Sequence, residues 1–475
     1  MSMVCKKKLY LPFPRNETLH IETQRTKTKT RVEPSDEKSI ERHVRQLLCN
    51  KIIGNLVGVW LLIPEHLRLG TWDLLLRWTN KSSGRVEPRL ALQLVHEAAL
   101  CTTGKRKKRT LSQQGFEVAN GLPFVGSDNS IHELLNAHTV CDAHVVQMML
   151  GKFRKALGHY PGTVLAMDPH RIQSYSKRQM VRRKKSPSSP AMKQIQTFFI
   201  FDADSQQPIC FTIGSSSKTV TSASIALLDL SAQILCPQQC KPLVLSDNEH
   251  YSFDLLHYVA HQSPFDLLVP MTKNKRLLKE FKTVDPESFT HHWVGYATTM
   301  QPFYPKSKKE KPYWQIIERL GESENDYQMN AFLCTSHEAA VQDPIQQFPK
   351  RWHCEEFFNE NQALGWDRAG TLNLNIRYGS MTMALIAQTA IYMMKKRVGD
   401  PIVQWDAQHL ANDFFHGLEG DVKLREDTII VTYYNAPNEK LLKDNYENLP
   451  EKLKREGINP KIPWLYDYKL DFRFK

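Results

Sequence analysis

The chain of 475 residues carries 63 lysine and arginine residues against 50 aspartate and glutamate residues, which gives a formal net charge of +13. Its hydrophobic content of 41% and charged content of 24% are typical of globular proteins and exclude a wholly disordered chain. The basic excess favours a polyanionic partner, nucleic acid first, and the longest apolar stretch, residues 52–64, is too short to cross a bilayer. No hydrophobic segment follows MSMVCKKK, and the nine cysteines have no framework spacing. We therefore expect an intracellular protein, cytoplasmic or nucleoid-associated, with no membrane partner.

The first third of the sequence predicts a basic arm followed by helices. Residues 1–35 are polar and basic, which is typical of a flexible arm. Apolar residues at helical spacing in residues 35–66, 70–80 and 88–103 predict helices, and we expect residues 36–158 to form an all-α DNA-binding region. A basic run within this region, which alone would be a solvated loop, is assigned to DNA contact: Lys105, Arg106, Lys107, Lys108 and Arg109.

Two further helices, predicted over residues 110–121 and 129–140, are joined by a short glycine-containing connection. This pattern is compatible with a helix-turn-helix, which would bring Asn129, Ser130 and His132 to a DNA groove. A plain helical hairpin fits the same pattern, and both interpretations remain open.

From residue 159 the hydrophobic period changes. Short apolar runs predict strands over 162–168, 194–202, 208–214, 241–247 and 265–270, with helices over 219–235 and 253–262. This order predicts an α/β fold in which a mixed sheet has helices on its faces. The predicted parts are a first core segment (159–273), a β-rich insertion (274–347), a second core segment with a helix (348–400) and a C-terminal region (401–475) with one strand over 427–436.

Three acidic residues follow this pattern. Asp168 and Asp247 end two predicted strands at the edge where α/β sheets bind ligands, and Glu355 lies on the helix after the insertion, with Arg351 one turn earlier. Each acid alone could belong to an ordinary turn or a solvated helix face, and Glu249, Glu356 and Glu360 compete for the same positions. Together, three carboxylates suit two Mg²⁺ ions, with Mn²⁺ as a substitute, and phosphodiester chemistry.

The residues resemble the DDE triad of transposases that have a ribonuclease H-like catalytic core, of the insertion-sequence 4 type. That family has the signature Tyr, two residues, Arg, three residues, Glu, six residues, Lys, and the matching positions here are Phe348, Arg351, Glu355 and Gln362. The likeness covers residues 162–399. It implies that Asp168, Asp247 and Glu355 are the catalytic metal ligands, and that Arg351, Phe348 and Gln362 stand where the family contacts phosphate.

The resemblance implies a DNA transposase that cuts transposon ends and joins the 3′ hydroxyl to target DNA by metal-dependent hydrolysis and transesterification. Its partners would be the double-stranded ends and the target, bound by a homodimer. The departures at Phe348 and Gln362 motivate an alternative, a transposase-derived DNA-binding protein without cleavage activity.

Two other segments have an expected role. The basic stretch 171–193 would project beside Asp168, either as a plain loop or, as we favour, as a DNA-contacting segment. Its assigned DNA-binding residues are Arg178, Arg182, Arg183, Lys184 and Lys185. In the insertion, Trp293 and Trp314 could stack on an unstacked base, but we expect tryptophans in a β-rich segment to belong to the core.

Overall fold

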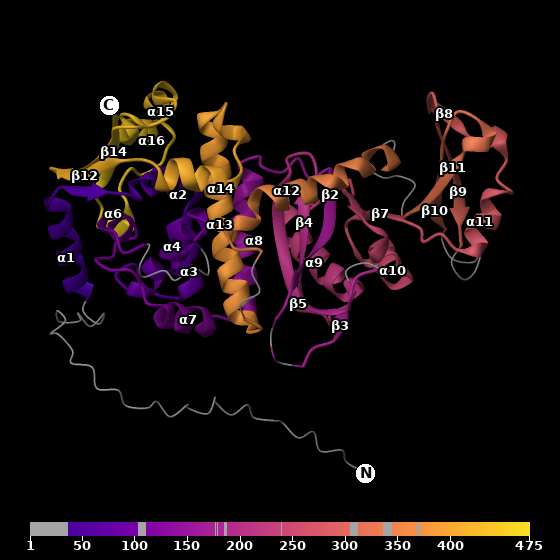
Figure 1. Ribbon diagram of the computed structural model, residues 1–475, viewed down its shortest axis with the longest axis horizontal. Helices are drawn as coiled ribbons and strands as arrows, with labels where there is room; N and C mark the ends of the chain where they lie inside the picture. The colour runs from indigo at the N-terminus through magenta and orange to yellow at the C-terminus, as the bar shows by residue number, and fades with distance from the viewer. Residues whose placement is uncertain are drawn as a thin grey trace, which may run out of the picture. The chain divides into compact units, whose positions relative to one another are not determined.

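The described part of the chain in this computed structural model comprises residues 37–102, 111–175, 177, 179–184, 188–238, 240–304, 312–335, 344–367 and 371–475 (Figure 1). All of them belong to one compact unit, Glu37–Lys475. The basic arm predicted over residues 1–35 lies outside the described residues. No helix in the described part of the chain is long and apolar enough to cross a membrane.

The first predicted helical stretch is interrupted. Helix α1 (Glu37–Cys49) is followed by strand β1 (Ile52–Gly54), a 3₁₀ helix (Val57–Leu62) and helix α2 (Ile63–Leu69). The chain cannot continue as a right-handed helix because Gly54 and Leu56 have positive φ angles of 152° and 64°. Since β1 pairs with a strand near the C-terminus, the prediction of an all-α N-terminal region is wrong at this strand.

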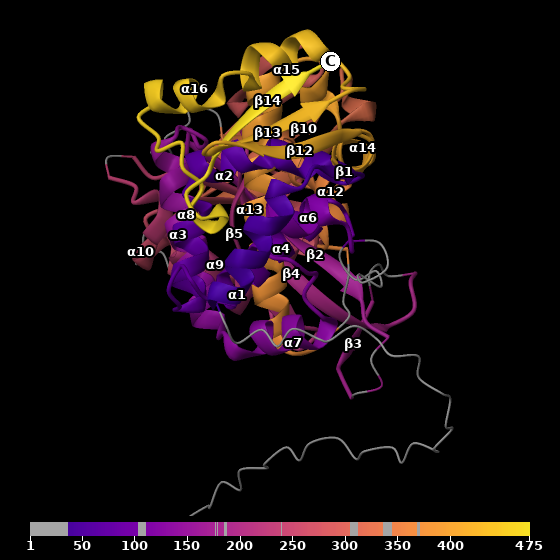
Figure 2. The ribbon, with the colours of Figure 1, turned by 90° about the vertical axis from the view of Figure 1, so that its left-hand side faces the viewer.

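Several of the remaining helices in the N-terminal region pack against one long helix, α13 (Leu374–Val398). The remaining helices are α3 (Thr71–Thr79), α4 (Val86–Ala99), α6 (Gln114–Ala119), α7 (Asp128–Ala137) and α8 (Val140–Ala156). Helix α13 packs against α4, α7 and α8, behind the N-terminal helices in the view of Figure 2. Most of its residues are buried. Asn129 and His132 are exposed on α7, and the helix-turn-helix remains a prediction.

The central sheet confirms the predicted order of strands and helices in residues 159–273, apart from the short strand β3, which was not predicted. Its strands are β2 (Val164–Gln173), β3 (Arg182–Arg183), β4 (Met192–Asp202), β5 (Gln207–Ser215), β6 (Leu243–Ser246) and β7 (Asp266–Pro270), with helices α9 (Val220–Leu235) and α10 (Phe253–Gln262). The spatial order is β5-β4-β2-β6-β7. Strand β4 is antiparallel to β2 and β5, whereas β2, β6 and β7 are parallel.

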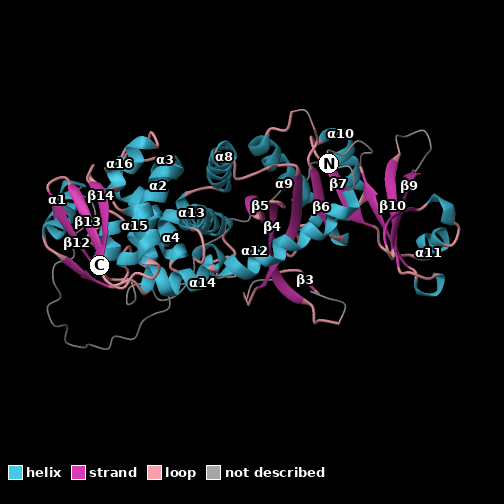
Figure 3. Ribbon diagram, turned by 90° about the horizontal axis from the view of Figure 1, so that it is seen from above, coloured by secondary structure: helices cyan, strands magenta, loops and turns pink. Residues whose placement is uncertain are grey.

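The insertion extends this sheet. It consists of α11 (Lys275–Phe281), β8 (Thr290–Trp293), β9 (Tyr296–Phe303), β10 (Tyr313–Leu320) and β11 (Gln328–Cys334). Strand β11 pairs with β7, so magenta strands continue from the core into the insertion in Figure 3. The aromatic-rich run 291–304 predicts one strand, but it forms two, β8 and β9, because Gly295 turns the chain with a φ of 73°.

The chain returns from the insertion through a 3₁₀ helix (Pro344–Trp352) into α12 (His353–Asn361). The C-terminal region contains α14 (Ala407–Leu410), β12 (Gly420–Arg425), β13 (Thr428–Tyr433), α15 (Glu439–Tyr446), α16 (Leu449–Arg455) and β14 (Lys469–Phe474). The prediction of one strand here is wrong, since a four-stranded sheet with the order β1-β12-β13-β14 is formed. The missed strands β12 and β14 have short sequences that contain charged residues. Strand β12 pairs with the adjacent β13 and with the distant β1, and β14 pairs with β13.

Candidate functional site

The parallel pair β2 and β6 brings Asp168 and Asp247 to the same edge of the sheet. Met167 and Ser246 are register partners, and each aspartate is the next residue along its chain. Adjacent strands are about 4.8 Å apart, so the two carboxyl groups are near neighbours. Strand β2 does not end at Asp168 as expected, because β2 stays paired with β4 as far as Gln173.

Arg351 connects this edge to Glu355. Its Nη1 lies 3.5 Å from Asp168 Oδ1 and its Nη2 lies 3.7 Å from Glu355 Oε1. The guanidinium is largely buried and lies over the Trp352 ring, 5.1 Å from the ring centroid. Asp168 and Glu355, which lie 187 residues apart in sequence, thus both contact the Arg351 guanidinium.

Packing of aromatic side chains fixes the position of α12. Phe358 stacks on His170 of β2, with ring centroids 4.3 Å apart, and Phe357 lies 4.8 Å from Phe201 of β4. Glu355 occurs in the first turn of the helix, where a negative charge is favoured by the helix dipole. The apolar face of α12 therefore holds Glu355 on the side of Asp168.

The competing acids have other surroundings. Glu249 accepts hydrogen bonds from Nη1 and Nη2 of Arg171. Glu356 is exposed, and Glu360 lines a small pocket with Tyr392 and Lys395. Asp168, Asp247 and Glu355 are thus the three acids that lie around Arg351.

Electrostatics couple these groups. Burial, together with the negative charges of Asp247 and Glu355, raises the pKa of Asp168 to about 7, although Arg351 and His250 act in the opposite direction. For Asp247, burial alone would raise the pKa, but the hydrogen bond and charge of His250 and the charge of Arg351 lower it. The site therefore has an excess of negative charge at Asp168 that a cation would offset.

The donor set fits a hard divalent cation such as Mg²⁺. Carboxylate oxygens are its preferred protein ligands. The pKa of Asp168 is raised first by burial and then by the charges of Asp247 and Glu355, and a bound cation would offset those charges. Within the described residues, no three His, Cys, Asp or Glu side chains are already arranged to hold a metal ion. The Arg351 guanidinium instead lies between Asp168 and Glu355.

The two signature departures have clear surroundings. Phe348 packs edge-on against Phe332 of β11 at 4.9 Å and lines a pocket of about 570 Å³ between the insertion and the 3₁₀ helix. Gln362 follows α12 and its side chain is exposed. A phosphate contact by either residue stays a prediction.

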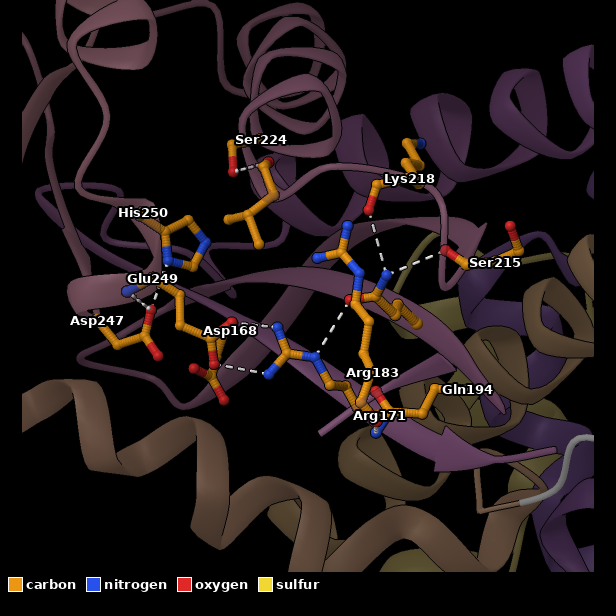
Figure 4. Close-up of polar contacts among 12 residues, drawn as sticks. Asp168, Arg171, Arg183, Gln194, Ser215, Lys218, Ser224, Asp247, Glu249 and His250 are labelled. Atoms are coloured by element: carbon orange, nitrogen blue, oxygen red, sulfur yellow. Dashed lines mark hydrogen bonds and ion pairs between the residues drawn. The ribbon is translucent and has the colours of Figure 1, made fainter. Parts of the chain in front are cut away.

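The basic stretch 171–193 is divided between internal and exposed residues. Arg171 forms a two-point ion pair with Glu249 and also donates from Nε to Gln196 Oε1 at 3.1 Å (Figure 4). This arginine therefore has an internal role that the sequence pattern did not indicate. Arg182 and Lys184 are exposed and Arg183 is half-buried at strand β3, and DNA contact by these three stays a prediction. Lys105–Arg109, Arg178 and Lys185 lie outside the described residues.

The tryptophans of the insertion differ from the core interpretation. Trp293 is 57% exposed, stacks on Tyr296 at 4.2 Å and lines the 570 Å³ pocket. Trp314 is half-buried in β10. The prediction of a core position is wrong for Trp293, because the insertion sheet is small and its edge strand β8 has few neighbours.

Sequence reasoning also missed His250. Its ring is fully buried, and Nδ1 lies 2.7 Å from Asp247 Oδ1. A histidine three residues after a predicted metal ligand was the available signal. Polar residues in a turn are usually exposed, so the spacing alone did not identify it.

Comparisons with known proteins do not assign the chain to a family. No family model matches the chain, and no curated protein does. Among solved structures, the chain is similar to a piggyBac transposase synaptic complex with hairpin DNA, determined by cryo-EM. The TM-score is 0.40 at 13% sequence identity, over 75% of this chain and 79% of that chain, and a likeness at this level assigns no family.

Proposed function

We propose that this protein is a DNA transposase of the DDE class with a ribonuclease H-like core, which cuts transposon ends and joins the freed 3′ hydroxyl to target DNA. The strand order β5-β4-β2-β6-β7, with β4 as the antiparallel strand, supports the core assignment. The observation that carries the proposal is the meeting of Asp168, Asp247, Glu355 and Arg351 at one edge of this sheet.

Asp168, Asp247 and Glu355 would hold two Mg²⁺ ions, for which Mn²⁺ would substitute. Bound in this way, divalent ions activate a nucleophilic oxygen and offset charge on the reacting phosphate and the leaving oxygen. The aspartates contribute rigid positions because both extend from the paired strands β2 and β6. Glu355 contributes a third carboxylate from a separate helix, so the site depends on the packing of α12.

Arg351 would exchange its acidic partners for a DNA phosphate. A guanidinium presents several donors in one plane, which suits phosphate oxygens. Its contacts of 3.5 and 3.7 Å with the two acids are longer than charge-assisted hydrogen bonds of about 2.7–2.9 Å, so the exchange costs little. In this way DNA would be placed beside the carboxylates.

DNA would extend from this edge in two directions. The basic residues at β3 would contact the phosphate backbone without reading sequence: Arg182, Arg183 and Lys184. On the insertion side, the exposed ring of Trp293 at the 570 Å³ pocket would stack on an unstacked base. Two protomers would be required to pair two transposon ends.

The test is strand cleavage by the full-length protein on duplexes carrying the sequences that flank its gene, with and without Mg²⁺. We expect nicked and joined products with the native chain, and their loss in Asp168→Asn, Asp247→Asn and Glu355→Gln. Cleavage that persists in all three variants would show that these acids are not catalytic.

A second candidate is a DNA-binding protein derived from a transposase. Two observations favour it: the Phe348 ring is packed on Phe332 and has no hydroxyl for phosphate, and Gln362 lacks the lysine charge. Such a binder would bind end sequences with an affinity indifferent to Mg²⁺ and would give no nicked product in the same assay.

A further inference from the structure

The carboxylate of Asp247 is held through one of its two oxygens. Oδ1 accepts the backbone N–H of Glu249 at 3.1 Å and lies 2.7 Å from Nδ1 of His250. No described residue forms a hydrogen bond with Oδ2. The turn after β6 therefore fixes the rotation of the carboxyl group and leaves one oxygen for a ligand outside the turn.

His250 is itself fixed in place. It ends the 3₁₀ turn Asn248–His250, which packs against α9 and β7, and its side chain has no exposed surface. The adjacent Glu249 is held by Arg171 of β2, so the turn is anchored on both sides (Figure 4). Arg171 in turn donates to Gln196, whose side-chain amide donates to the backbone carbonyls of Ser215 and Lys218.

The second ring nitrogen of His250 has no evident structural use. A carboxylate can only accept, so Nδ1 donates its proton to Asp247, and this contact makes no use of Nε2. Nε2 is buried and has no hydrogen-bond partner among the described residues. An unsatisfied buried polar atom lowers the stability of the fold, so an apolar side chain would suit this position better for packing alone.

We propose that His250 is a positioning residue for the metal site: it orients Asp247 so that Oδ2 faces the divalent cation. This inference rests on the proposed function, because it assigns His250 to the same metal site. Outer residues that hydrogen-bond a metal ligand fix its geometry, and their loss lowers metal affinity about 10–100-fold. His250 holds Asp247 in the same way that such residues do, from beneath the ligand and out of contact with DNA.

The experiment is a titration of the DNA-free, full-length protein with MnCl₂, with free Mn²⁺ measured by electron paramagnetic resonance. His250→Leu removes the donor and roughly keeps the volume, and we expect Mn²⁺ affinity to fall about tenfold or more. His250→Asn places an amide N–H at the Nδ1 position, and we expect it to recover most of the affinity.

A matched control is His96 of α4. It is also fully buried, its Nδ1 lies 2.8 Å from Asn120 Oδ1, and its Nε2 also lacks a hydrogen-bond partner among the described residues. His96→Leu should lower the thermal midpoint much as His250→Leu does while leaving Mn²⁺ affinity at the native value. Should His250→Leu not fold, His250→Gln takes its place, because its amide lies one methylene too far out to replace Nδ1.

The outcomes separate the two proposals. Equal Mn²⁺ binding by the native protein and Asp168→Asn would refute the metal site, and the role of His250 with it. Loss of binding in Asp168→Asn, together with native affinity in His250→Leu, would overturn the role of His250 alone. A His250→Asn variant as weak as His250→Leu would also overturn it.

Discussion

The ionisation of Asp168 should destabilise the metal-free protein at neutral pH. Its pKa in the folded chain is about 7, against an ordinary value of 3.8, because burial and the charge of Asp247 oppose ionisation. A carboxyl group with a raised pKa loses stability as the pH rises. The loss begins near pH 4, where the unfolded chain ionises, and levels off above about pH 7, where the folded chain has ionised too.

The magnitude follows from these two values. At about 1.36 kcal/mol for each pKa unit, the full cost above pH 7 is at most roughly 4 kcal/mol, of which roughly 1.6 kcal/mol is already present at pH 5. Asp168→Asn removes the ionisation, and its amide oxygen can still accept from Arg351. Because the Arg351 charge already enters the pKa of Asp168, the remaining difference between the neutral acid and the amide is nearly constant with pH. The clearest quantity is therefore the change, between pH 5 and pH 8, in the difference in unfolding free energy between variant and native chain, roughly 2–3 kcal/mol in favour of the variant.

The assay is urea unfolding followed by tryptophan fluorescence, in EDTA, at pH 5, 6, 7 and 8, for the native chain and Asp168→Asn. Asp254→Asn, an exposed aspartate on α10, serves as the control and should show no such trend. A stability difference that is flat with pH, or that shrinks as the pH rises, would refute the electrostatic account of the site.

Three further results are expected. Arg351→Ala should lower strand cleavage about 10²–10³-fold, as loss of a charge-stabilising donor does, and cleavage at the native rate would contradict its placement. Phe358→Ala should reduce the free energy of unfolding by roughly 3–5 kcal/mol, measured in urea, because its buried ring stacks on His170; an unchanged midpoint would show that α12 is held otherwise. Trp293→Ala should leave the urea midpoint nearly unchanged, because the ring is 57% exposed. The same variant should weaken binding of DNA with an unpaired base by about 1–3 kcal/mol, measured by fluorescence anisotropy, and equal loss on fully paired DNA would argue against stacking.

The core strands were predictable because their sequences are locally unambiguous. The apolar runs that form β2, β4, β5, β6 and β7 are short and bounded by turns. The segments before β6 and β7 have apolar residues at helical spacing and form α9 and α10. The sequences GDVKLR and KLDFRF alternate with charge and are short, and they form β12 and β14 because each gains a partner strand. The β1 segment looked helical because its apolar residues continue the helical spacing, and its pairing with β12 lies more than 360 residues away in sequence.

The candidate site residues likewise divide into those that the local sequence indicated and contacts that it did not. Local pattern singled out Asp168 and Asp247 at the ends of apolar runs, and the resemblance to the transposase signature favoured Glu355 over the neighbouring acids. Their catalytic role stays a prediction. The local sequence did not indicate which arginine each acid would contact. The Arg351 contact with Asp168 spans 183 residues and depends on how the 3₁₀ helix Pro344–Trp352 packs against β2. The Arg171 contact with Glu249 spans 78 residues and depends on the pairing of β2 with β6.

The sequence by itself therefore determined the order of the core elements and the basic character of the chain, and it indicated three candidate acids. Tertiary structure alone decided that Arg171 pairs with Glu249, that Trp293 is exposed, and that His250 is buried beneath Asp247. The physical reason is that hydrophobic period and residue spacing are properties of neighbouring residues. Burial and ion pairing, in contrast, are set by the strands and helices that the fold brings alongside them.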